Sequence, residues 1–325
     1  MPFSHIKMLK LDKIDLKLLH ALSENSRRSI SQIAKLINTS KNTLLYRIKK
    51  LEKNKTILFY QTIINHSLTG VFCGRIMIKF TKYDEKNFSE FIVFIKTLNK
   101  IGGISRTYGK YDLILIVYFK KLSDFANIHE LIHQKITNNV ELMNVCLINE
   151  LYYCAANKLM FGQHIPPAII KFNRTPAIID TKDEFLLKKL RENPKETIVS
   201  LAQKCNCTTK TLMQRKHNLE KKKIILRYSI MINHTKLDYV LHHVFWKFST
   251  FNVKDVKRLK EHISLMSETF FITEVFCSNM LETGFLVKNE LELHNLLNNI
   301  IKKFPELIKS YELLLIKDIT LLREN

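Results

Sequence analysis

The sequence predicts an α+β fold in which a three-helix unit and a βαββαβ domain follow one another, and in which this whole arrangement occurs twice. Three observations lead to it. The chain matches itself at a fixed offset of 168 residues, each copy begins with short amphipathic helices, and each continues with alternating strand and helix patterns. With 325 residues, of which 46% are hydrophobic, the chain is long enough to form several buried cores.

The internal repeat is the strongest of these observations. At an offset of 168 residues, 23 of the 56 positions from residue 11 to residue 66 are identical, and no gap is needed. Asp12 then falls on Asp180, and Arg47 falls on Arg215. We expect two copies joined by a proline-containing bridge. The expected segments are residues 1–62 and 178–230 for the helical units, 70–154 and 238–325 for the βαββαβ domains (the second degenerate), and 155–177 for the linker.

Each copy is expected to begin with three short helices. In the first copy, Asp12 is placed to cap a helix at residues 12–24, and Ser29 is placed to cap a short second helix. A tight turn then leads to a third helix, which Ser40 is placed to cap. This order is typical of a helix-turn-helix, and the β-rich stretch at residues 57–64 is expected to add a wing and a connecting strand.

The third helix is the candidate functional element of the unit. Leu44, Ile48 and Leu51 recur at helical spacing and give it one apolar seam. Its other faces carry lysine, asparagine and tyrosine side chains, which suits a helix that enters a nucleic-acid groove. Taken alone, the segment is equally consistent with a solvated basic helix, because runs of charge are often only solubilising. The distribution of charge along the chain favours a helix that enters a nucleic-acid groove over one that is only solvated.

The net charge of +22 is concentrated in the two helical units. Residues 1–60 carry 13 Lys and Arg against 4 Asp and Glu, and residues 178–230 carry 13 against 6. Positive charge gathered on two matching segments indicates a polyanionic partner, with double-stranded DNA the first candidate. An anionic membrane surface is the weaker alternative, because the sequence has no long basic amphipathic helix of the interfacial kind.

The sequence predicts a cytoplasmic, nucleoid-associated protein without a membrane partner. The longest continuous apolar run, Leu113–Phe119, is far too short to span a bilayer. The N-terminal residues lack the apolar core of a signal peptide. The six cysteines show no CxxC spacing, so we expect them to be reduced and mostly buried.

After each helical unit the pattern changes to strands and helices in the order βαββαβ, which is the ferredoxin-like arrangement. In the first copy we expect strands at residues 72–81 and 140–153, two more around a turn within 104–120, and helices at 86–99 and 122–136, with Gly102 and Gly103 ending the first helix. Helices on one side of such a sheet leave its other face bare. We therefore expect that face to pack on a second sheet, in a dimer or a pseudo-dimer.

The residues from Leu11 to Ile57 resemble the DNA-binding domain of the Lrp/AsnC (feast/famine) transcription regulators, and TYGKYDLILIV (107–117) resembles the Gly-x-Tyr-Asp segment of that family's effector domain. The resemblance implies two copies of a winged helix-turn-helix followed by a ferredoxin-like effector domain. It implies a regulator that binds pseudo-palindromic, often AT-rich DNA, senses an amino acid and self-associates further. The tandem two-copy form departs from the usual single-copy homodimer, and we expect the copies to pair as an intramolecular pseudo-dimer.

The DNA contacts are expected on and around the third helix of each copy. The family pattern carries over to Ser40, Thr43, Arg47, Thr208, Thr211 and Arg215. Phosphate contacts are expected from Arg27, Arg28, Lys41, Arg47, Lys49, Lys50, Lys195, Lys210, Arg215 and Lys216. Base contacts are expected from Lys41, Asn42, Tyr46, Thr209, Lys210 and Gln214. The alternative for Arg47 is a structural salt bridge and that for Tyr46 is packing on the wing. Because the two helices differ, the half-sites should be unequal.

The resemblance also implies an effector loop in the first copy, made by Gly109, Tyr111 and Asp112. Its carboxylate would meet the ammonium group of an amino acid. At the matching positions the second copy has Cys277, Asn279 and Met280. A small-molecule site is therefore expected to be asymmetric, or absent from the second copy.

Two other functions are compatible with the same features. The high positive charge also suits an architectural DNA-packing protein of this fold. An enzyme is the third hypothesis, because sirohaem decarboxylases resemble this architecture, and Arg106, Tyr108 and the histidines would then bind a tetrapyrrole. The turn at Tyr108–Asp112 fits the regulator pattern better. We therefore expect neither enzymatic activity nor a cofactor.

The metal signals in the sequence are weak. His129 and His133 lie in an HExxH pattern, which can place two imidazoles on one helix face. The second copy has nothing similar, and no third ligand stands out. The pair His242-His243 and the Cys205-x-Cys207 spacing also lack partners at ligand spacing. No metal site is expected.

Overall fold

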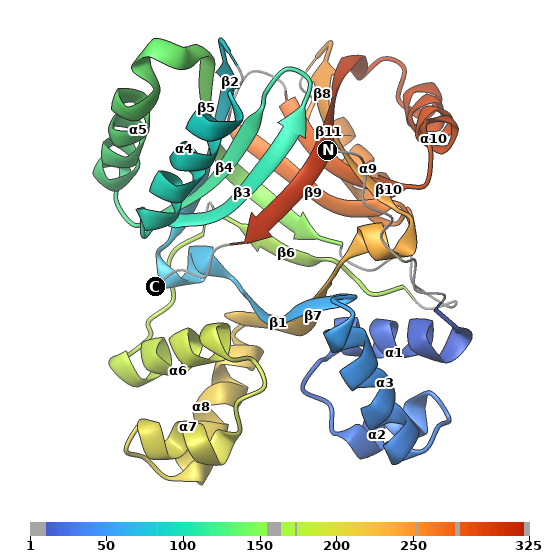
Figure 1. The fold of residues 1–325 in the computed structure, drawn as a ribbon. Coiled ribbons are helices and arrows are strands. Elements are labelled where there is room, and N and C mark those ends of the chain that lie inside the picture. Colours follow the sequence, from blue (N-terminus) through green and yellow to red (C-terminus); the bar gives the residue numbers. More distant parts are fainter. Residues whose placement is uncertain are drawn as a thin grey trace.

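The computed structural model describes residues 11–82, 84–154, 164–172, 174–250, 252–276 and 280–321. Figure 1 shows two helical units at one end of the molecule, a large sheet with helices around it at the other end, and a two-stranded ribbon between them. None of the described helices is both long and apolar enough to cross a membrane.

The helices at the lower end form as their capping residues predict. The first unit contains α1 (Lys13–Glu24), α2 (Ile30–Leu36) and α3 (Lys41–Lys53), and the second contains α6 (Thr181–Glu192), α7 (Ile198–Lys204) and α8 (Thr209–Lys221). The side chains of Asp12, Ser29 and Ser40 each accept backbone hydrogen bonds in the first turn of their helix. These bonds satisfy N–H groups that have no partner inside the helix, which fixes where each helix begins.

The stretch predicted to form a wing does not form one. Strand β1 (Ile57–Ile64) pairs antiparallel with β7 (Ile225–Ile232) of the other half of the chain. The core of the first helical unit contains Ile230 from β7, and the core of the second contains Ile64 from β1. Because each helical core is completed by a strand from the other half, the ribbon holds the two units in a fixed relative position.

In the described part of the chain, nine strands form the large sheet, and eight of them close into a barrel. They are β2 (Phe72–Phe80), β3 (Ile101–Tyr108), β4 (Leu113–Phe119), β5 (Val140–Tyr153), β6 (Ala168–Lys171), β8 (Val240–Phe248), β9 (Thr269–Phe276), β10 (Met280–Val287) and β11 (Ile308–Leu321). Their order is β2-β4-β3-β11-β8-β10-β9-β5-β6, and β2 also pairs with β5. Each half supplies four strands in the ferredoxin-like order, and β6 adds to the outside of β5.

The two long strands β5 and β11 join the halves. Strand β5 leaves β2 and continues along β9, with Leu147 opposite Phe276. Strand β11 leaves β8 and continues along β3, with Leu315 opposite Tyr108. The bare sheet faces therefore meet inside the barrel, where side chains from both halves pack together. The second sheet that the sequence predicted comes from the same chain.

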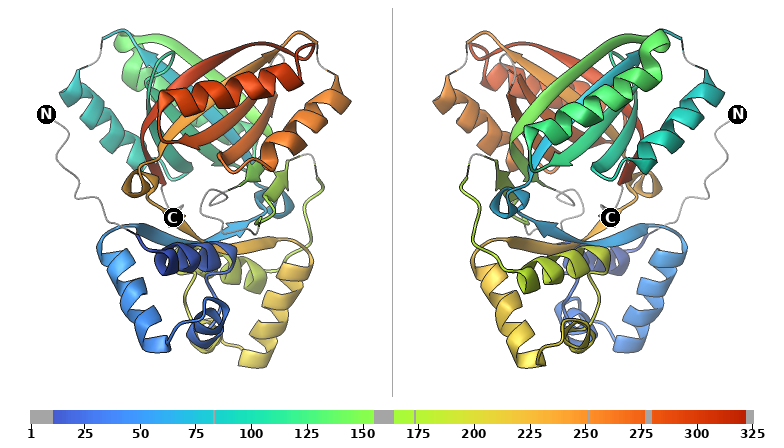
Figure 2. Two further views of the ribbon diagram at one scale, coloured as in Figure 1. Left: turned by 90° about the vertical axis from the view of Figure 1, so that its right-hand side faces the viewer. Right: turned by 90° about the vertical axis from the view of Figure 1, so that its left-hand side faces the viewer.

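Four helices cover the outside of the barrel: α4 (Glu85–Thr97), α5 (Leu122–Ile136), α9 (Val253–Ser264) and α10 (Glu290–Lys303). Two further hydrophobic cores lie between these helices and the strands, one in each half. Short 3-10 turns at His66–Thr69, Thr137–Asn139 and His234–Leu237 complete the described elements. Figure 2 shows the barrel layer above the ribbon and the helical units below it from two sides.

One local prediction is wrong for a physical reason. Gly102 and Gly103 do not end a helix but lie inside β3. A Cβ atom on Gly102 would lie 2.3 Å from the Tyr118 ring, so the ring requires glycine there. The predicted linker contains an ordered strand, β6, that pairs with β5, and its Ile170 is buried. Residues 155–163 of the linker lie outside the described part of the chain.

Candidate nucleic-acid interface

The third helix of the first unit, α3, is buried along one seam and open on the opposite face. Leu44, Ile48 and Leu51 face the core of the unit, as the spacing predicts. The side chains expected to contact bases are exposed on the open face, at Lys41, Asn42 and Tyr46, and so is Lys49. The helix is therefore not sealed against the protein, and its polar face is free to enter a groove. Tyr46, which is 69% exposed, does not pack on a wing.

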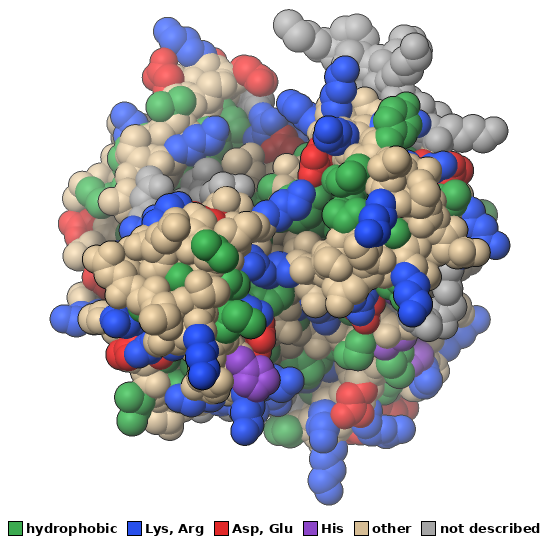
Figure 3. Space-filling model, turned by 90° about the horizontal axis from the view of Figure 1, so that it is seen from below, with side chains coloured by type: hydrophobic (Ala, Val, Ile, Leu, Met, Phe, Trp, Pro, Cys, Tyr) green, Lys and Arg blue, Asp and Glu red, His purple; other side chains and the backbone are tan. Residues whose placement is uncertain are grey.

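The equivalent helix α8 is presented in the same way at the same end of the molecule. Leu212 and Leu219 are buried, while Lys210, Thr211 and Gln214 are exposed and Thr209 is half-buried. An open groove runs along α8 and includes Lys210, Gln214, Asn218 and Lys222 in its lining. Figure 3 views this end from below and shows Lys and Arg side chains spread across it. Sequence reasoning missed Asn218 and Lys222, although helical spacing from Gln214 would have identified them.

The hydroxyl groups expected at the start of each third helix serve first as caps. The Ser40 Oγ accepts a hydrogen bond from the Thr43 backbone N–H at 3.1 Å, and the two hydroxyl groups are 2.8 Å apart. Thr208 and Thr211 repeat this arrangement at 3.1 and 2.9 Å. Ser40, Thr208 and Thr211 remain exposed, so they are available at the helix N-termini, where an anion is favoured.

Arg47 forms the structural salt bridge that was the alternative to its DNA contact, and Arg215 forms the matching one. The Arg47 guanidinium donates hydrogen bonds to Asp15 and Asp12 at 2.7 Å each, which raises the pKa of Arg47 above its usual value. Arg215 contacts Asp183 and Asp180 in the same way, at 2.9 Å each. In each unit, the ion pairs of this arginine connect the third helix to the start of the first helix. Their assignment as phosphate contacts is therefore corrected.

Replacing Arg47 with Met should destabilise the first helical unit. The change leaves the Asp15 carboxylate, whose side chain is 4% exposed, without its cation. We expect a loss of about 2 kcal/mol, less than for a fully buried pair because Asp12 is 53% exposed. Urea unfolding of the full chain, followed by circular dichroism, measures it. Lys49→Met on the exposed face is the control; an equally stable R47M protein would restore Arg47 as a candidate DNA contact.

Arg27 and Lys195, expected at phosphates, instead connect the two helical units. The Arg27 guanidinium donates hydrogen bonds to the carbonyl oxygens of Pro194 and Glu196 of the other unit. Lys195, which matches Arg27 at the 168-residue offset, places its ammonium 3.6 Å from the centre of the Tyr60 ring. The two side chains thus add to the β1–β7 ribbon in fixing the separation of the units.

The remaining expected phosphate contacts divide into paired and free cations. Arg28 lies 2.6 Å from Glu24, and Lys216 lies 2.7 Å from Glu220. Within the part of the chain that the structure describes, the four remaining lysines among these expected contacts make no ion pair: Lys41, Lys49, Lys50 and Lys210. These four carry the strongest case for phosphate binding.

The predicted effector loop is closed by its own hydrogen bonds. The Asp112 carboxylate accepts hydrogen bonds from the Lys79 ammonium and the Phe80 backbone N–H, both at 2.9 Å. Tyr111 is 4% exposed, and its hydroxyl oxygen accepts a hydrogen bond from Asn144 at 2.8 Å. Gly109 has a φ of 128°, which favours glycine.

These contacts correct the expectation of a free effector carboxylate, because Asp112 is neutralised by Lys79 and Tyr111 belongs to the barrel interior. Gly109 is the exposed member of the three. In the second half, Cys277 and Asn279 lie outside the described residues, and so does the side chain of Met280.

The described residues contain no group of three or more His, Cys, Asp or Glu side chains placed to hold a metal ion. His129 and His133 lie one turn apart on α5 with ring centres 6.3 Å apart, and His133 is exposed. Cys205 and Cys207 are half-buried free thiols. His243 is buried in the barrel, where burial and the nearby Arg75 hold the pKa of its imidazole well below the usual value.

Comparison with known proteins gives two kinds of likeness. Residues 11–52 match the AsnC-type helix-turn-helix domain. The chain is 31% identical over 145 residues to an uncharacterized HTH-type transcriptional regulator of Pyrococcus abyssi, which covers 44% of this chain and 96% of that protein. It is 28% identical over 135 residues to the proline dehydrogenase transcriptional activator of Rhizobium radiobacter, covering 41% and 85%. The siroheme decarboxylase NirDL matches 96% of this chain and 95% of its own with a TM-score of 0.62, but at 13% identity this likeness concerns the fold alone.

Proposed function

This chain belongs to the transcription regulators that carry an AsnC-type helix-turn-helix domain, and from that premise we propose that it binds double-stranded DNA with both of its recognition helices at once. The observation that carries the proposal is the exposure of the polar faces of α3 and α8 at one end of the molecule. The ribbon between them supports it, because a fixed separation lets two helices enter successive turns of one groove.

The proposal includes a tandem two-copy architecture, in which the two copies within one chain take the place of the two subunits of a homodimer. The repeat at 168 residues supports it, as do the shared ribbon and the barrel that needs four strands from each half. The domain limits stay those that the sequence predicts, and β6 lies within the predicted linker. Further self-association and location at the nucleoid stay predictions.

The DNA site of such a protein has two unequal halves. Asn42 and Tyr46 on α3 match Lys210 and Gln214 on α8. Asn and Gln pair with adenine edges, whereas Lys reaches guanine acceptors, so the two helices favour different bases. Because the halves are covalently joined, the protein binds its site in one orientation, unlike a symmetric homodimer on a palindrome.

An amino-acid effector stays a prediction that rests on the family resemblance. Asp112 and Tyr111 are held by Lys79 and Asn144, so a ligand would have to use other groups. The fold likeness to NirDL is in favour of the enzyme hypothesis. Against it, Arg106, one of the candidate tetrapyrrole ligands, forms an ion pair with Asp318 across the β3–β11 seam. The regulator remains the function that the sequence relatives support.

Selection of bound DNA from a random pool tests the proposal. We expect enrichment of a non-palindromic sequence with two half-sites about one helical turn apart. Failure to enrich any sequence at moderate salt would contradict sequence-specific regulation. Equal affinity for selected and random DNA would favour the architectural alternative. Repeating the selection with pooled amino acids tests for an effector.

The lysines of the recognition helix should determine how the affinity depends on salt. Lys49→Ala removes one free cation from the groove-facing surface, so the slope of log K against log salt should fall by about one in magnitude. Affinity should fall evenly across sequences, since phosphates carry no base information. Lys257→Ala is the matched control, because this lysine is 72% exposed but lies on α9 in the barrel layer. An unchanged slope in K49A would exclude a phosphate contact there.

A further inference from the structure

Both recognition helices expose an apolar side chain at the same position. Leu45 on α3 is 43% exposed, and Met213 on α8 is 55% exposed. The two residues match at the 168-residue offset. Neither belongs to the buried seam of its helix, which Leu44 and Leu212 form at the preceding position. Packing within the described protein therefore does not account for their apolar character.

Exposed apolar residues on the other helices of the two units show no such match. Leu36 on α2 is 57% exposed, but the matching residue is Lys204. Val199 on α7 is also 57% exposed, and it matches Ser31. Single exposed apolar side chains are ordinary on protein surfaces. The shared position on the two recognition helices stands apart, because both units have an exposed apolar group there. The residues one turn away on the same side differ, since Lys41 and Lys49 match Thr209 and His217.

The surroundings of Leu45 and Met213 belong to the groove-facing surface. Residues four positions apart lie on the same side of a helix, so Leu45 lies between the exposed Lys41 and Lys49. Met213 lies between Thr209 and the exposed His217. An apolar side chain among these polar groups is brought against base edges when the helix enters the major groove. The apolar group that bases present there is the C5-methyl of thymine.

We propose that Leu45 and Met213 each contact the C5-methyl group of a thymine, so that every bound site has a thymine at the same place in its two half-sites. The inference rests on the proposed DNA-binding function and adds a specificity determinant to it. Polar contacts by Asn42 and Tyr46, or by Lys210 and Gln214, make the half-sites different. The shared apolar contact makes them alike at one base pair.

Replacing thymine by uracil removes the methyl group and leaves base pairing intact, which provides the test. Each thymine of a selected site is replaced singly, and the affinity of the full chain is measured. Loss of one buried methyl contact should lower affinity about fourfold at one position in each half-site. Replacement at other thymines should change affinity little.

Two variants assign each methyl contact to its side chain. Leu45→Ala should no longer distinguish thymine from uracil at the sensitive position of one half-site, and Met213→Ala should lose the distinction only in the other. Leu36→Ala and Val199→Ala are matched controls, since they truncate side chains on α2 and α7 that are at least as exposed. Both controls should keep the full fourfold discrimination.

The possible results distinguish a failure of the thymine contact from a failure of the proposed DNA-binding function. If the protein enriches no DNA, the proposed function fails, and the thymine contact that rests on it fails as well. If it binds selected DNA but no thymine is sensitive to uracil, or if L45A and M213A keep the discrimination of the unaltered protein, the methyl contact is wrong and the regulator stands.

Discussion

Replacing Glu282 with Ile should destabilise the protein by about 3–5 kcal/mol, because it leaves a buried arginine without its counter-ion. Arg75 on β2 and Glu282 on β10 form an ion pair inside the barrel, with side chains 6% and 0% exposed. Arg75 also donates a hydrogen bond to Thr273 at 3.0 Å, and His243 lies 3.3 Å from the Glu282 carboxylate. Burial lowers the pKa of Arg75, but the guanidinium stays charged at neutral pH.

The double variant Arg75→Met with Glu282→Ile tests whether the cost comes from the unpaired charge. Replacing both partners of a buried pair by apolar groups is often neutral or stabilising, so the double variant should recover most of the loss. Ile is also the residue at the matching position of the first half, Ile114. A double variant as unstable as E282I would show that the strand packing, and not the charge, is at fault.

Trp246 gives this experiment a local probe. It is the single tryptophan of the chain, it is fully buried beside β10, and its indole N–H donates a hydrogen bond to Thr283 at 2.9 Å. Its fluorescence during urea unfolding therefore follows the barrel directly. Because Arg75 and Glu282 come from different halves, the measurement also reports how strongly the halves depend on each other.

The local part of this fold could be predicted from the sequence, because its signals lie within a few residues of one another. Ser40 and Thr43 define a cap by their spacing, and Leu44 and Ile48 define a seam. The ferredoxin-like order of strands follows from the pattern of elements along the chain. The exposed face of α3 follows from its buried face, so the base-contact candidates on this helix, Lys41, Asn42 and Tyr46, are exposed.

The longer-range part could not be predicted, since the partners are distant in sequence and chemically ordinary. Arg47 donates a hydrogen bond to Asp15, which is 32 residues away in the sequence. Arg27 donates one to the backbone carbonyl of Glu196, which is 169 residues away. From the sequence alone, both arginines are indistinguishable from free DNA-binding cations. The same holds for the β1–β7 pairing, which turned an expected wing into a shared ribbon. Charge near a recognition helix identifies the region but not which cations are already paired.

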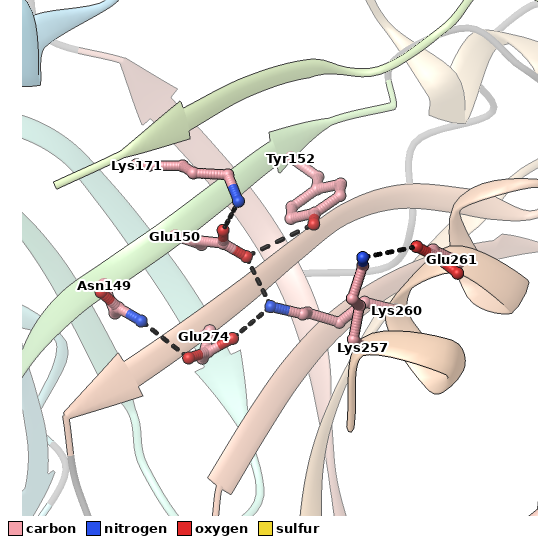
Figure 4. A network of polar contacts seen from close by, with 8 residues as sticks. All are labelled: Asn149, Glu150, Tyr152, Lys171, Lys257, Lys260, Glu261 and Glu274. Atoms are coloured by element: carbon pink, nitrogen blue, oxygen red, sulfur yellow. Dashed lines mark hydrogen bonds and ion pairs between the residues drawn. The ribbon is translucent and has the colours of Figure 1, made fainter. Parts of the chain in front are cut away.

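Replacing Lys260 with Met should destabilise the protein by about 3 kcal/mol at neutral pH, because it leaves two carboxylates facing each other at the β5–β9 seam. Figure 4 shows the Lys260 ammonium between Glu150 of β5 and Glu274 of β9, with which it forms ion pairs. The three side chains are 8%, 7% and 16% exposed. Lys171 contacts Glu150 at 2.5 Å, and Asn149 donates a hydrogen bond to Glu274 at 2.7 Å.

The opposite seam shows why a lysine is needed here. At the β3–β11 seam, Arg106 and Asp318 form a direct ion pair. The residues that match them at the 168-residue offset are Glu274 and Glu150, so this seam has two acids where the other has an acid and a base. Lys260 comes from α9 to separate them, and its own match in the first half is the apolar Ile92. The two seams therefore use different charges to join the same halves.

The pH dependence of stability should reverse in K260M, which distinguishes charge from packing. In the unaltered protein, burial by itself raises the pKa of Glu150, but hydrogen bonds from Lys171 and Lys260 outweigh it and lower that pKa below 4.5. This stabilisation is present above pH 4.5 and is lost as the pH falls through the lowered pKa. Without Lys260 the facing carboxylates repel, the folded-state pKa of Glu150 rises, and protonation relieves the repulsion.

The free energy of unfolding should therefore increase in K260M between pH 7 and pH 5, where that of the unaltered protein changes little at this site. Urea unfolding at the two pH values measures it. Lys257→Met is the matched control, because Lys257 lies on the same helix, is 72% exposed and contacts Glu261 at 3.8 Å. It should cost less than about 0.5 kcal/mol. A K260M protein that is equally unstable at both pH values would show that Lys260 acts through its aliphatic chain, and not by separating the two carboxylates.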